Sequence, residues 1–313
     1  MYAPPKERRM KHLYVGLDGG GTKTEVCMID GQKREVERFQ TGSINLAGQN
    51  RAAVQENLSA AVRKIVMLGS GADLAGMWIG AAGVSHPEAQ QVLKQAVRSG
   101  GYAGKLHITG DPPIALAGAL GRAVGSILIS GTGSICYGRL ADGKEARTGG
   151  WGHLVDDEGS GYAIGRDILS AVLQAQDGRR SATILTSLVF DALQVDCIAG
   201  VLEFVYRPDR PKKEIAALAR LLNIACELGD EAAVEIAQTA AKALVRLVSP
   251  VLESLKLQKE KLALAGGVLQ HISSVKARTM AILTQQYPEL ILCISEKDAA
   301  YGAALMAFWE TLE

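Results

Sequence analysis

The sequence has few aromatic residues, no excess charge of either sign and no long apolar run. Phe, Trp and Tyr make up 5% of the 313 residues, and the apolar 48% is therefore mostly aliphatic. This composition favours helices packed on a sheet over an all-β sandwich. A formal net charge of +1 gives no reason to expect nucleic acid or an anionic membrane as a partner. Because no segment approaches the length of a membrane-spanning helix, we expect a cytoplasmic protein.

Cysteine is scarce and scattered. No two cysteines have the CxxC spacing of a zinc or redox site, and their number is odd. We expect them to be small buried residues in a reducing cytosol. They are Cys27, Cys136, Cys197, Cys226 and Cys293.

Residues 1–12 are charged and carry two prolines, with no apolar region behind them, so they are read as a frayed leader and not as a signal peptide. From residue 13 onward, short apolar segments alternate with helical periodicity. Strands are expected at Leu13–Leu17, Glu25–Ile29, Glu35–Gln40, Gly76–Ala81, Leu106–Thr109, Ser126–Ser130, Ile135–Leu140, Lys261–Ala265 and Leu290–Ile294. Helices are expected at Ala52–Val66, Glu88–Val97, Pro112–Leu120, Gly159–Ala175, Ala182–Leu193, Lys213–Leu228, Glu231–Leu257 and Ala299–Thr311.

Two segments repeat one pattern of strand, small-residue turn and strand, at Leu13–Asp30 and at Ser126–Leu140. The repeat suggests two related α/β halves that face each other. We place the smaller N-terminal domain at 1–122, with the closing helix at 298–313 packed on it. The larger C-terminal domain then covers 123–297.

The first turn has the composition of a phosphate-binding loop. Asp18 ends a strand, and Gly19, Gly20 and Gly21 follow it. Glycines let backbone N–H groups approach an anion closely, and the next three residues, Thr22, Lys23 and Thr24, add hydroxyls and a positive charge. Asp18 could hold Mg²⁺ through water. The segment is no Walker A loop, since Thr22 separates lysine from the last glycine and a strand follows. An ordinary hairpin turn is the alternative.

The second turn, Ser130 to Ser134 with Gly131, Thr132 and Gly133 between them, has the same ingredients directly after an apolar strand. Two such turns can hold one polyphosphate from both sides, and the pair is more informative than either turn alone.

Asp111 follows a strand end and precedes a helix that opens with proline. A carboxylate in that position can accept a hydroxyl proton from a nucleophile. Aspartate is also favoured as a helix N-cap, and the two roles can coexist.

The segment from Gly149 to Gly161 places Trp151 between glycines in a polar loop, where a core role would explain it poorly. An aromatic face packs well against the C–H face of a sugar, and the carboxylates of Asp156 and Asp157 could chelate hydroxyls. Those acids could equally stabilise the N-terminus of the next helix. Gly266 and Gly267, after a strand, could lie under a flat ligand or form a simple strand-to-helix turn.

Taken in order, these segments resemble the sugar kinase, heat-shock protein 70 and actin superfamily. They are most similar to its N-acetylglucosamine kinase branch, grouped with the BadF-type ATPases. The resemblance spans Leu13 to about Leu305, and its most specific string is GGWGHLVDDEGSGYAIG next to SGTGS. It implies an α/β fold of two RNase H-like (actin-like ATPase) domains with a cleft between them. It also implies ATP and Mg²⁺ as cofactors, phosphorylation of an amino sugar at its 6-hydroxyl, and a homodimer.

The resemblance assigns roles residue by residue. Asp111 would be the catalytic base, and Asp18 would face Mg²⁺. The nucleotide would bind Gly19, Gly20, Gly21, Thr22, Lys23, Thr24, Gly131, Thr132, Gly133 and, at the adenosine, Gly266 and Gly267. The sugar would bind Asn45, Asp111, Thr132, Gly133, Ser134, Gly150, Trp151 and Asp157.

Three residues depart from the pattern of the related kinases. Ile135 stands where the mammalian-type enzyme has asparagine, Asp156 stands where glycine precedes the aspartate, and Gly161 stands where alanine occurs. Glucosamine and N-acetylmuramic acid therefore stay open as alternative substrates to N-acetylglucosamine. More distant alternatives are an ATP-dependent activator of a partner enzyme, which would need cysteines to ligate an iron–sulfur cluster, and a sugar sensor without catalysis.

Overall fold

The structure, a computed structural model, describes residues 12–46, 50–84 and 86–312. Residues 1–11 of the expected leader lie outside these ranges. By its internal contacts the chain separates into two compact units. Unit 1 contains the described residues up to Val124 and those from Ser295 onward, and unit 2 is Gly125–Ile294. The sequence analysis had placed these borders at 122/123 and 297/298.

Unit 1 contains one five-stranded sheet in the order β3-β2-β1-β4-β5. β1 pairs antiparallel with β2 and parallel with β4, and β4 pairs parallel with β5. The strands are β1 (His12–Gly19), β2 (Lys23–Asp30), β3 (Glu35–Gly42), β4 (Asp73–Ala81) and β5 (Leu106–Thr109). The helices are α1 (Arg51–Leu68), α2 (Pro87–Ser99), α3 (Asp111–Leu120) and α12 (Ala299–Trp309).

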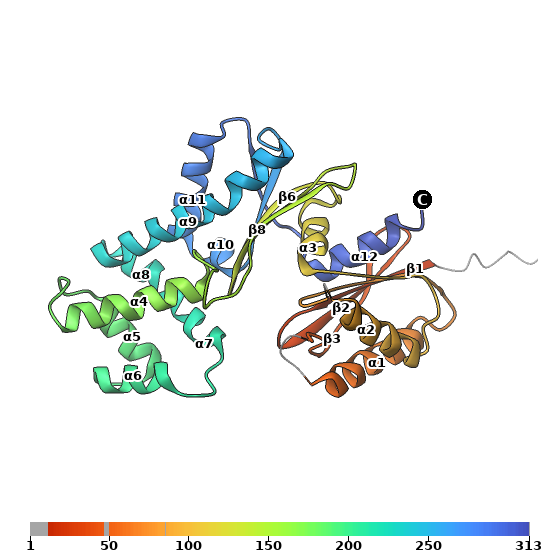
Figure 1. Ribbon diagram of the computed structural model, residues 1–313, viewed down its shortest axis with the longest axis horizontal. Helices are drawn as coiled ribbons and strands as arrows, with labels where there is room; N and C mark the ends of the chain where they lie inside the picture. Colours follow the sequence, from red (N-terminus) through yellow and green to blue (C-terminus); the bar gives the residue numbers. More distant parts are fainter. Residues whose placement is uncertain (1–11, 47–49, 85, 313) are drawn as a thin grey trace, which may run out of the picture. The chain divides into compact units, whose positions relative to one another are not determined.

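Both faces of this sheet are covered, because side chains alternate between the faces of a strand. Leu13, Val15 and Leu17 of β1 pack in one core with apolar residues of α1 and α2. Tyr14, between them in sequence, packs in another core with alanines of α12. Figure 1 shows α1 and α2 side by side and α12 close to β1. β1 is thus a central strand, and its C-terminal end is fixed from both sides.

Unit 2 contains a second five-stranded sheet in the order β10-β9-β6-β7-β8. Its strands are β6 (Gly125–Ser130), β7 (Ser134–Arg139), β8 (Glu145–Gly149), β9 (Lys261–Ala265) and β10 (Ile291–Ile294). Its α-helices are α4 (Gly161–Gln176), α5 (Leu185–Leu193), α6 (Ile198–Tyr206), α7 (Lys212–Ala217), α8 (Leu221–Glu227), α9 (Glu231–Leu255), α10 (Gly267–His271) and α11 (Ser273–Gln286). One large aliphatic core joins the sheet to these helices.

The two sheets have the same topology. In each, the first strand of the unit is central, pairs antiparallel with the next strand through a tight turn, and pairs parallel with a later strand. The third strand extends each sheet on the antiparallel side. The prediction of two related α/β halves from the repeated strand–turn–strand pattern is therefore confirmed.

Four elements were not predicted from the sequence, and two others differ from the prediction. The four are β8, α6, α10 and α11. The single helix expected at 213–228 is α7 and α8 joined by a 3₁₀ turn at Leu218–Arg220. His12, expected in the frayed leader, begins β1. Within the described part of the chain, no helix is long and apolar enough to cross a membrane.

Candidate functional site

Unit 1 brings two aspartates together at the C-terminal ends of its parallel strands. Asp18 is the seventh residue of β1, and Asp111 follows the end of β5 by two residues. β4 lies between these strands and presents Gly80 at the same level, paired with Asp18 on one side and Thr109 on the other. The two carboxylates interact electrostatically. Residues separated by 93 positions in sequence thus form one acidic site.

The carboxyl group of Asp111 is not used in holding the fold. Gly110 is the N-cap of α3, and no side chain caps this helix, so the N-cap role considered for Asp111 is wrong. Its Oδ1 is buried, with no hydrogen-bond partner in the described structure. Burial, and then the nearby charge of Asp18, raise the pKa of Asp111 to about 7. A buried carboxyl oxygen without a partner, poised to titrate near neutrality, suits a general base.

The carboxylates of Asp298 and Glu25 lie close enough to Asp18 to act on it electrostatically. Burial, then the charges of Asp298 and Glu25, raise the pKa of Asp18 to about 6, against the opposing effect of Lys23. Lys23 Nζ lies 2.7 Å from Glu25 Oε1, so part of its charge is neutralised within the turn. The surplus of negative charge around Asp18 fits a divalent cation, which prefers carboxylate oxygens and water as ligands.

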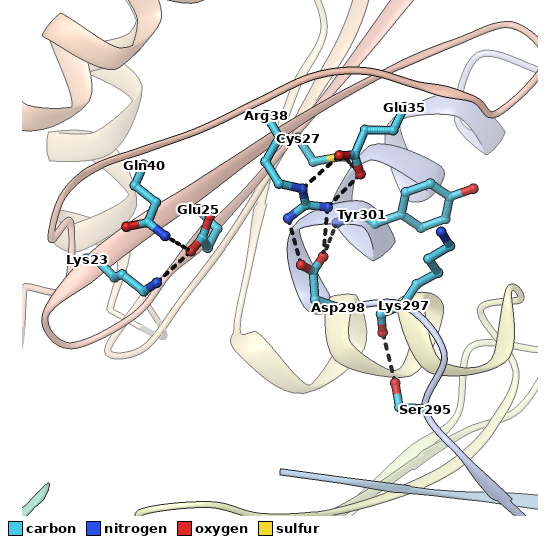
Figure 2. A network of polar contacts seen from close by, with 10 residues as sticks. All are labelled: Lys23, Glu25, Cys27, Glu35, Arg38, Gln40, Ser295, Lys297, Asp298 and Tyr301. Carbon is cyan, nitrogen blue, oxygen red and sulfur yellow. Dashed lines mark hydrogen bonds and ion pairs between the residues drawn. The ribbon is translucent and has the colours of Figure 1, made fainter. Parts of the chain in front are cut away.

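Asp298 is held in place by a network that Figure 2 shows. Its carboxylate caps α12 by accepting from the backbone N–H of Tyr301, 3.0 Å away. Arg38 of β3 donates to it at 2.6 Å and to Glu35 at 2.9 Å. The start of α12 is thereby tied to the edge of the sheet, and a carboxylate from near the C-terminus is fixed close to the first glycine turn.

The first glycine turn connects β1 and β2 as a hairpin, and a strand follows it as predicted. Ser43 joins Asn45 to this turn, because its hydroxyl donates to the carbonyl of Gly20 at 2.8 Å and accepts from the backbone N–H of Asn45 at 3.2 Å. Asn45 therefore lies beside the turn.

The hydroxyl of Thr24, which we assigned to nucleotide binding, instead forms a hydrogen bond within the sheet. Thr24 is fully buried, and its hydroxyl donates to the carbonyl of Gly42 at 3.0 Å. Thr24 therefore joins β2 to the end of β3 and is not placed to donate to a phosphate. Gly21, Thr22 and Lys23, in contrast, are exposed.

The second glycine turn, at 131–133 in unit 2, is braced by the start of α4. The backbone N–H groups of Gly161 and Tyr162 donate to the carbonyls of Gly131 and Thr132 at 2.8 and 3.3 Å. Ser134, assigned to the sugar, is buried and donates its hydroxyl to the carbonyl of Glu158 at 2.8 Å. Its side chain thus stabilises the loop before α4 and does not reach toward a ligand.

A hollow of about 440 Å³ adjoins this turn. Gly131, Thr132 and Gly267 line it, so the second phosphate turn and the proposed adenosine turn share one cavity within unit 2. Gly266 joins the two turns closely. It has φ +89° at the N-cap of α10, and a Cβ there would lie 2.3 Å from the carbonyl oxygen of Ser130. Gly266 and Gly267 do form a strand-to-helix turn, and that turn also lines a cavity.

Three cationic or titratable side chains on the wall of this hollow were missed by the sequence analysis. Lys213, Arg220 and His271 line it together with alanines of α7 and the 3₁₀ turn. Basic side chains around a glycine-lined cavity suit an anionic ligand such as a nucleotide. In the sequence they belong to ordinary helical segments and carry no motif that could have identified them.

The loop before α4 is packed against the second glycine turn. Asp157 is buried with φ +66°, a strained conformation for a residue other than glycine. Its Oδ1 accepts from the backbone N–H of Ser134 at 3.3 Å, and a Cβ on Gly133 would lie 2.8 Å from its Oδ2. Only glycine at position 133 leaves room for the carboxylate of Asp157. Gly133 and Asp157, both assigned to the sugar, are therefore in contact.

Trp151 lies on the surface of the same loop and is 73% exposed. Asp156 fixes it by accepting from its backbone N–H at 2.9 Å. Gly150, its neighbour, packs against Ile135 of β7. The acids of this loop do not cap the next helix, because Ser160 is the N-cap of α4 and its first turn has no acidic residue. The ring of Trp151 is thus exposed and not part of the core.

The cysteines are partly as expected. Cys27 and Cys136 are buried and Cys226 and Cys293 are half-buried, whereas Cys197 is exposed at the N-cap of α6. The expectation of burial is wrong for Cys197, because it lies before the first turn of α6, where its side chain faces solvent. Among the described residues no three His, Cys, Asp or Glu side chains form a metal-binding cluster.

Solved structures share this fold. A structure from Chromobacterium violaceum, provisionally named an N-acetylglucosamine kinase, matches with TM-score 0.74 and 23% identity over 96% of this chain and 99% of that one. A ROK family glucokinase from Streptomyces griseus, in complex with glucose and AMPPNP, matches with TM-score 0.60 and 16% identity over 94% and 98%. The two units are therefore the two domains of the actin-like ATPase and sugar kinase fold.

Similarity in sequence defines the family. The chain belongs to the BadF/BadG/BcrA/BcrD ATPase family, whose model matches residues 15–307. It is 35% identical to an N-acetylmuramic acid/N-acetylglucosamine kinase of Clostridium acetobutylicum, over 95% of this chain and 98% of that protein. It is 31% identical to an N-acetyl-D-glucosamine kinase of Dictyostelium discoideum over the same shares.

Proposed function

We propose that this protein is an ATP-dependent kinase that phosphorylates N-acetylglucosamine, or a related hexosamine, on its 6-hydroxyl. The observation that carries the proposal is the carboxyl group of Asp111. One of its oxygens is buried without a partner, beside Asp18, in a fold shared with sugar kinases. The names of the relatives in Clostridium and Dictyostelium support an amino sugar as the acceptor.

The nucleotide is assigned to the glycine turns. The backbone N–H groups of the turns after β1 and β6 bind its phosphates, and the hollow beside Gly267, with Lys213 and Arg220 on its wall, takes its adenosine end. ATP supplies the transferred phosphoryl group, and Mg²⁺ neutralises charge on its phosphates. Asp18 would hold that ion, directly or through water.

The sugar is assigned to Asn45, Asp111, Asp157 and Trp151. Asp111 accepts the proton of the 6-hydroxyl as that oxygen attacks, a step worth about 10²–10⁴ in rate. Asn45 and Asp157 bind hydroxyls, and the exposed ring of Trp151 covers the C–H face of the sugar. Water must be excluded for the phosphoryl group to reach the sugar and not solvent.

The proposal also includes a homodimer that works in the cytoplasm. The resemblance to other kinases of the branch supports the homodimer. Light scattering after size-exclusion chromatography tests the oligomeric state directly.

A coupled ADP-release assay tests the function. Purified protein is given MgATP with N-acetylglucosamine, glucosamine, N-acetylmuramic acid, N-acetylmannosamine or glucose, and Asp111→Asn is run beside it to exclude a contaminating kinase. We expect sugar-dependent ADP release, fastest with an amino sugar and greatly reduced in the variant. A rate of ADP release that is the same with and without every sugar tested would contradict the proposal. A brown, iron-containing protein would instead favour an ATP-driven activator that uses the exposed thiol of Cys197.

A further inference from the structure

An exposed arginine and an exposed tryptophan are stacked at the end of β8. The guanidinium carbon of Arg147 lies 4.4 Å from the ring centroid of Trp151. Both side chains are exposed, and Trp151 remains 73% exposed with Arg147 over its ring. The proposed sugar platform therefore carries a positive charge that the assigned roles leave unexplained.

Arg147 has no acidic partner in the described part of the chain. Its Nε donates to the carbonyl of Gly149 at 3.3 Å, and its two Nη groups have no hydrogen-bond partner among the described residues. Arg139, on the adjacent strand β7, differs: it forms an ion pair with Glu145 at 3.5 Å. An arginine on this sheet can therefore form an ion pair with an acidic residue of the adjacent strand, but Arg147 forms none among the described residues.

The acidic groups of the same loop are engaged elsewhere. Asp156 accepts from the backbone N–H of Trp151, and Asp157 is buried and accepts from that of Ser134. Neither forms an ion pair with Arg147 in the described structure. The guanidinium is held over an aromatic ring by one hydrogen bond and one cation–π contact, which limits its rotamers before any ligand arrives.

A guanidinium with free Nη donors matches the two oxygens of a carboxylate. We infer that Arg147 is a specificity-determining residue that binds a carboxylate carried by the sugar, so that the enzyme acts on acidic hexosamines as well as neutral ones. The inference rests on the proposed function, since Trp151 must be the sugar platform. The acidic group would be a short, flexible substituent of the ring, able to reach past the edge of Trp151.

A structural role for Arg147 predicts something different. If Arg147 only supports Trp151, its loss weakens the binding of every sugar by the same factor. If Arg147 binds a carboxylate, its loss affects an acidic sugar more than a neutral one. The ratio of kcat/KM for the two sugars separates these roles, because effects common to both cancel.

The experiment compares N-acetylmuramic acid, which is N-acetylglucosamine with a 3-O-lactyl carboxylate, with its uncharged lactyl amide. We expect the wild type to prefer the acid over the amide by about tenfold at low salt, as one exposed charge-assisted pair allows, and less at high salt. Arg147→Gln should abolish that preference, and Arg147→Lys should retain part of it. Arg139→Gln, a matched loss of one positive charge from the same sheet, should keep it.

Each outcome has a distinct meaning. Equal use of the acid and the amide by the wild type, or a preference that survives Arg147→Gln, overturns the inference while the kinase proposal stands. Failure to phosphorylate any amino sugar, N-acetylglucosamine included, contradicts the proposed function and this inference with it. Thermal melts of all variants establish that each is folded.

Discussion

Replacing Asp111 with asparagine should make the protein more stable and nearly inactive. The carboxyl group is buried with one oxygen unpartnered, and its pKa is raised from 3.8 to about 7. A raised pKa means that the folded protein binds the proton more tightly than the unfolded chain. The folded state is therefore penalised once the group ionises, and stability falls as the pH rises from about 4 to about 7.

The size of this penalty follows from the pKa. At roughly 1.4 kcal/mol per pH unit, the gap between 3.8 and about 7 corresponds to about 4 kcal/mol. Asp111 also begins α3, and the positive end of that helix favours the carboxylate by about 1 kcal/mol. Burial of the asparagine amide costs about another 1 kcal/mol. Above pH 7.5 we therefore expect Asp111→Asn to be stabilised by about 2 kcal/mol.

Urea unfolding of wild type and variant at several pH values measures this difference. We expect it to grow between pH 5 and pH 7 and to level off above pH 7.5. Turnover should fall by about 10²–10⁴, with the affinity for ATP retained, because only the proton acceptor is lost. In the wild type, kcat/KM for the sugar should rise with pH through a midpoint near 7.

Three results would refute this reasoning. The first is a variant less stable than the wild type at pH 8. The second is a stability difference that grows toward low pH, since the sign of the linkage would then be wrong. The third is a turnover number within a few-fold of the wild type, which would remove Asp111 from the role of base.

Three further substitutions test other parts of the site. Trp151→Ala should weaken sugar binding about tenfold or more with an unchanged melting temperature, because its exposed ring contributes to binding and not to the core; equal sugar affinity by calorimetry would contradict the platform. Gly266→Val should lower the free energy of unfolding by about 2 kcal/mol or more, since a side chain meets the Ser130 carbonyl at positive φ; unchanged urea denaturation would show that the turn can relax. Arg38→Met should cost about 1 kcal/mol, because its ion pairs, including that with Asp298, are part-exposed; a loss that persists in 1 M salt would point to packing instead.

The parts of the candidate site that could be predicted from the sequence are those formed by consecutive residues, such as the two glycine turns. A strand followed by glycines and hydroxyls is visible twice, and both hairpins were found where they were predicted. The roles of the hydroxyls were less predictable. The residues around Thr24 and Ser134 in the sequence do not reveal whether each hydroxyl faces a ligand or a backbone carbonyl. In the folded protein both hydroxyls donate to a backbone carbonyl.

Features made by distant segments were not predictable from local patterns. Asp298 acts on Asp18 across 280 positions, and only the packing of α12 on the sheet brings them together. β8 was missed because, as an edge strand with alternate residues exposed, it has no apolar pattern. α11 was missed because only one residue per turn is buried, at Val275, Thr279 and Leu283, which is too narrow a stripe to identify by eye.

The division of the chain has a consequence for biosynthesis. Unit 2 is one continuous segment, whereas unit 1 needs α12 from the far end of the sequence to complete its core. During translation, β1 and its glycine turn are made 280 positions before α12 begins (299 − 19), so the alanines that cover them arrive late. One apolar face of the first sheet therefore stays uncovered in the nascent chain until α12 has been synthesised, and Asp298, which precedes α12, reaches Asp18 no earlier.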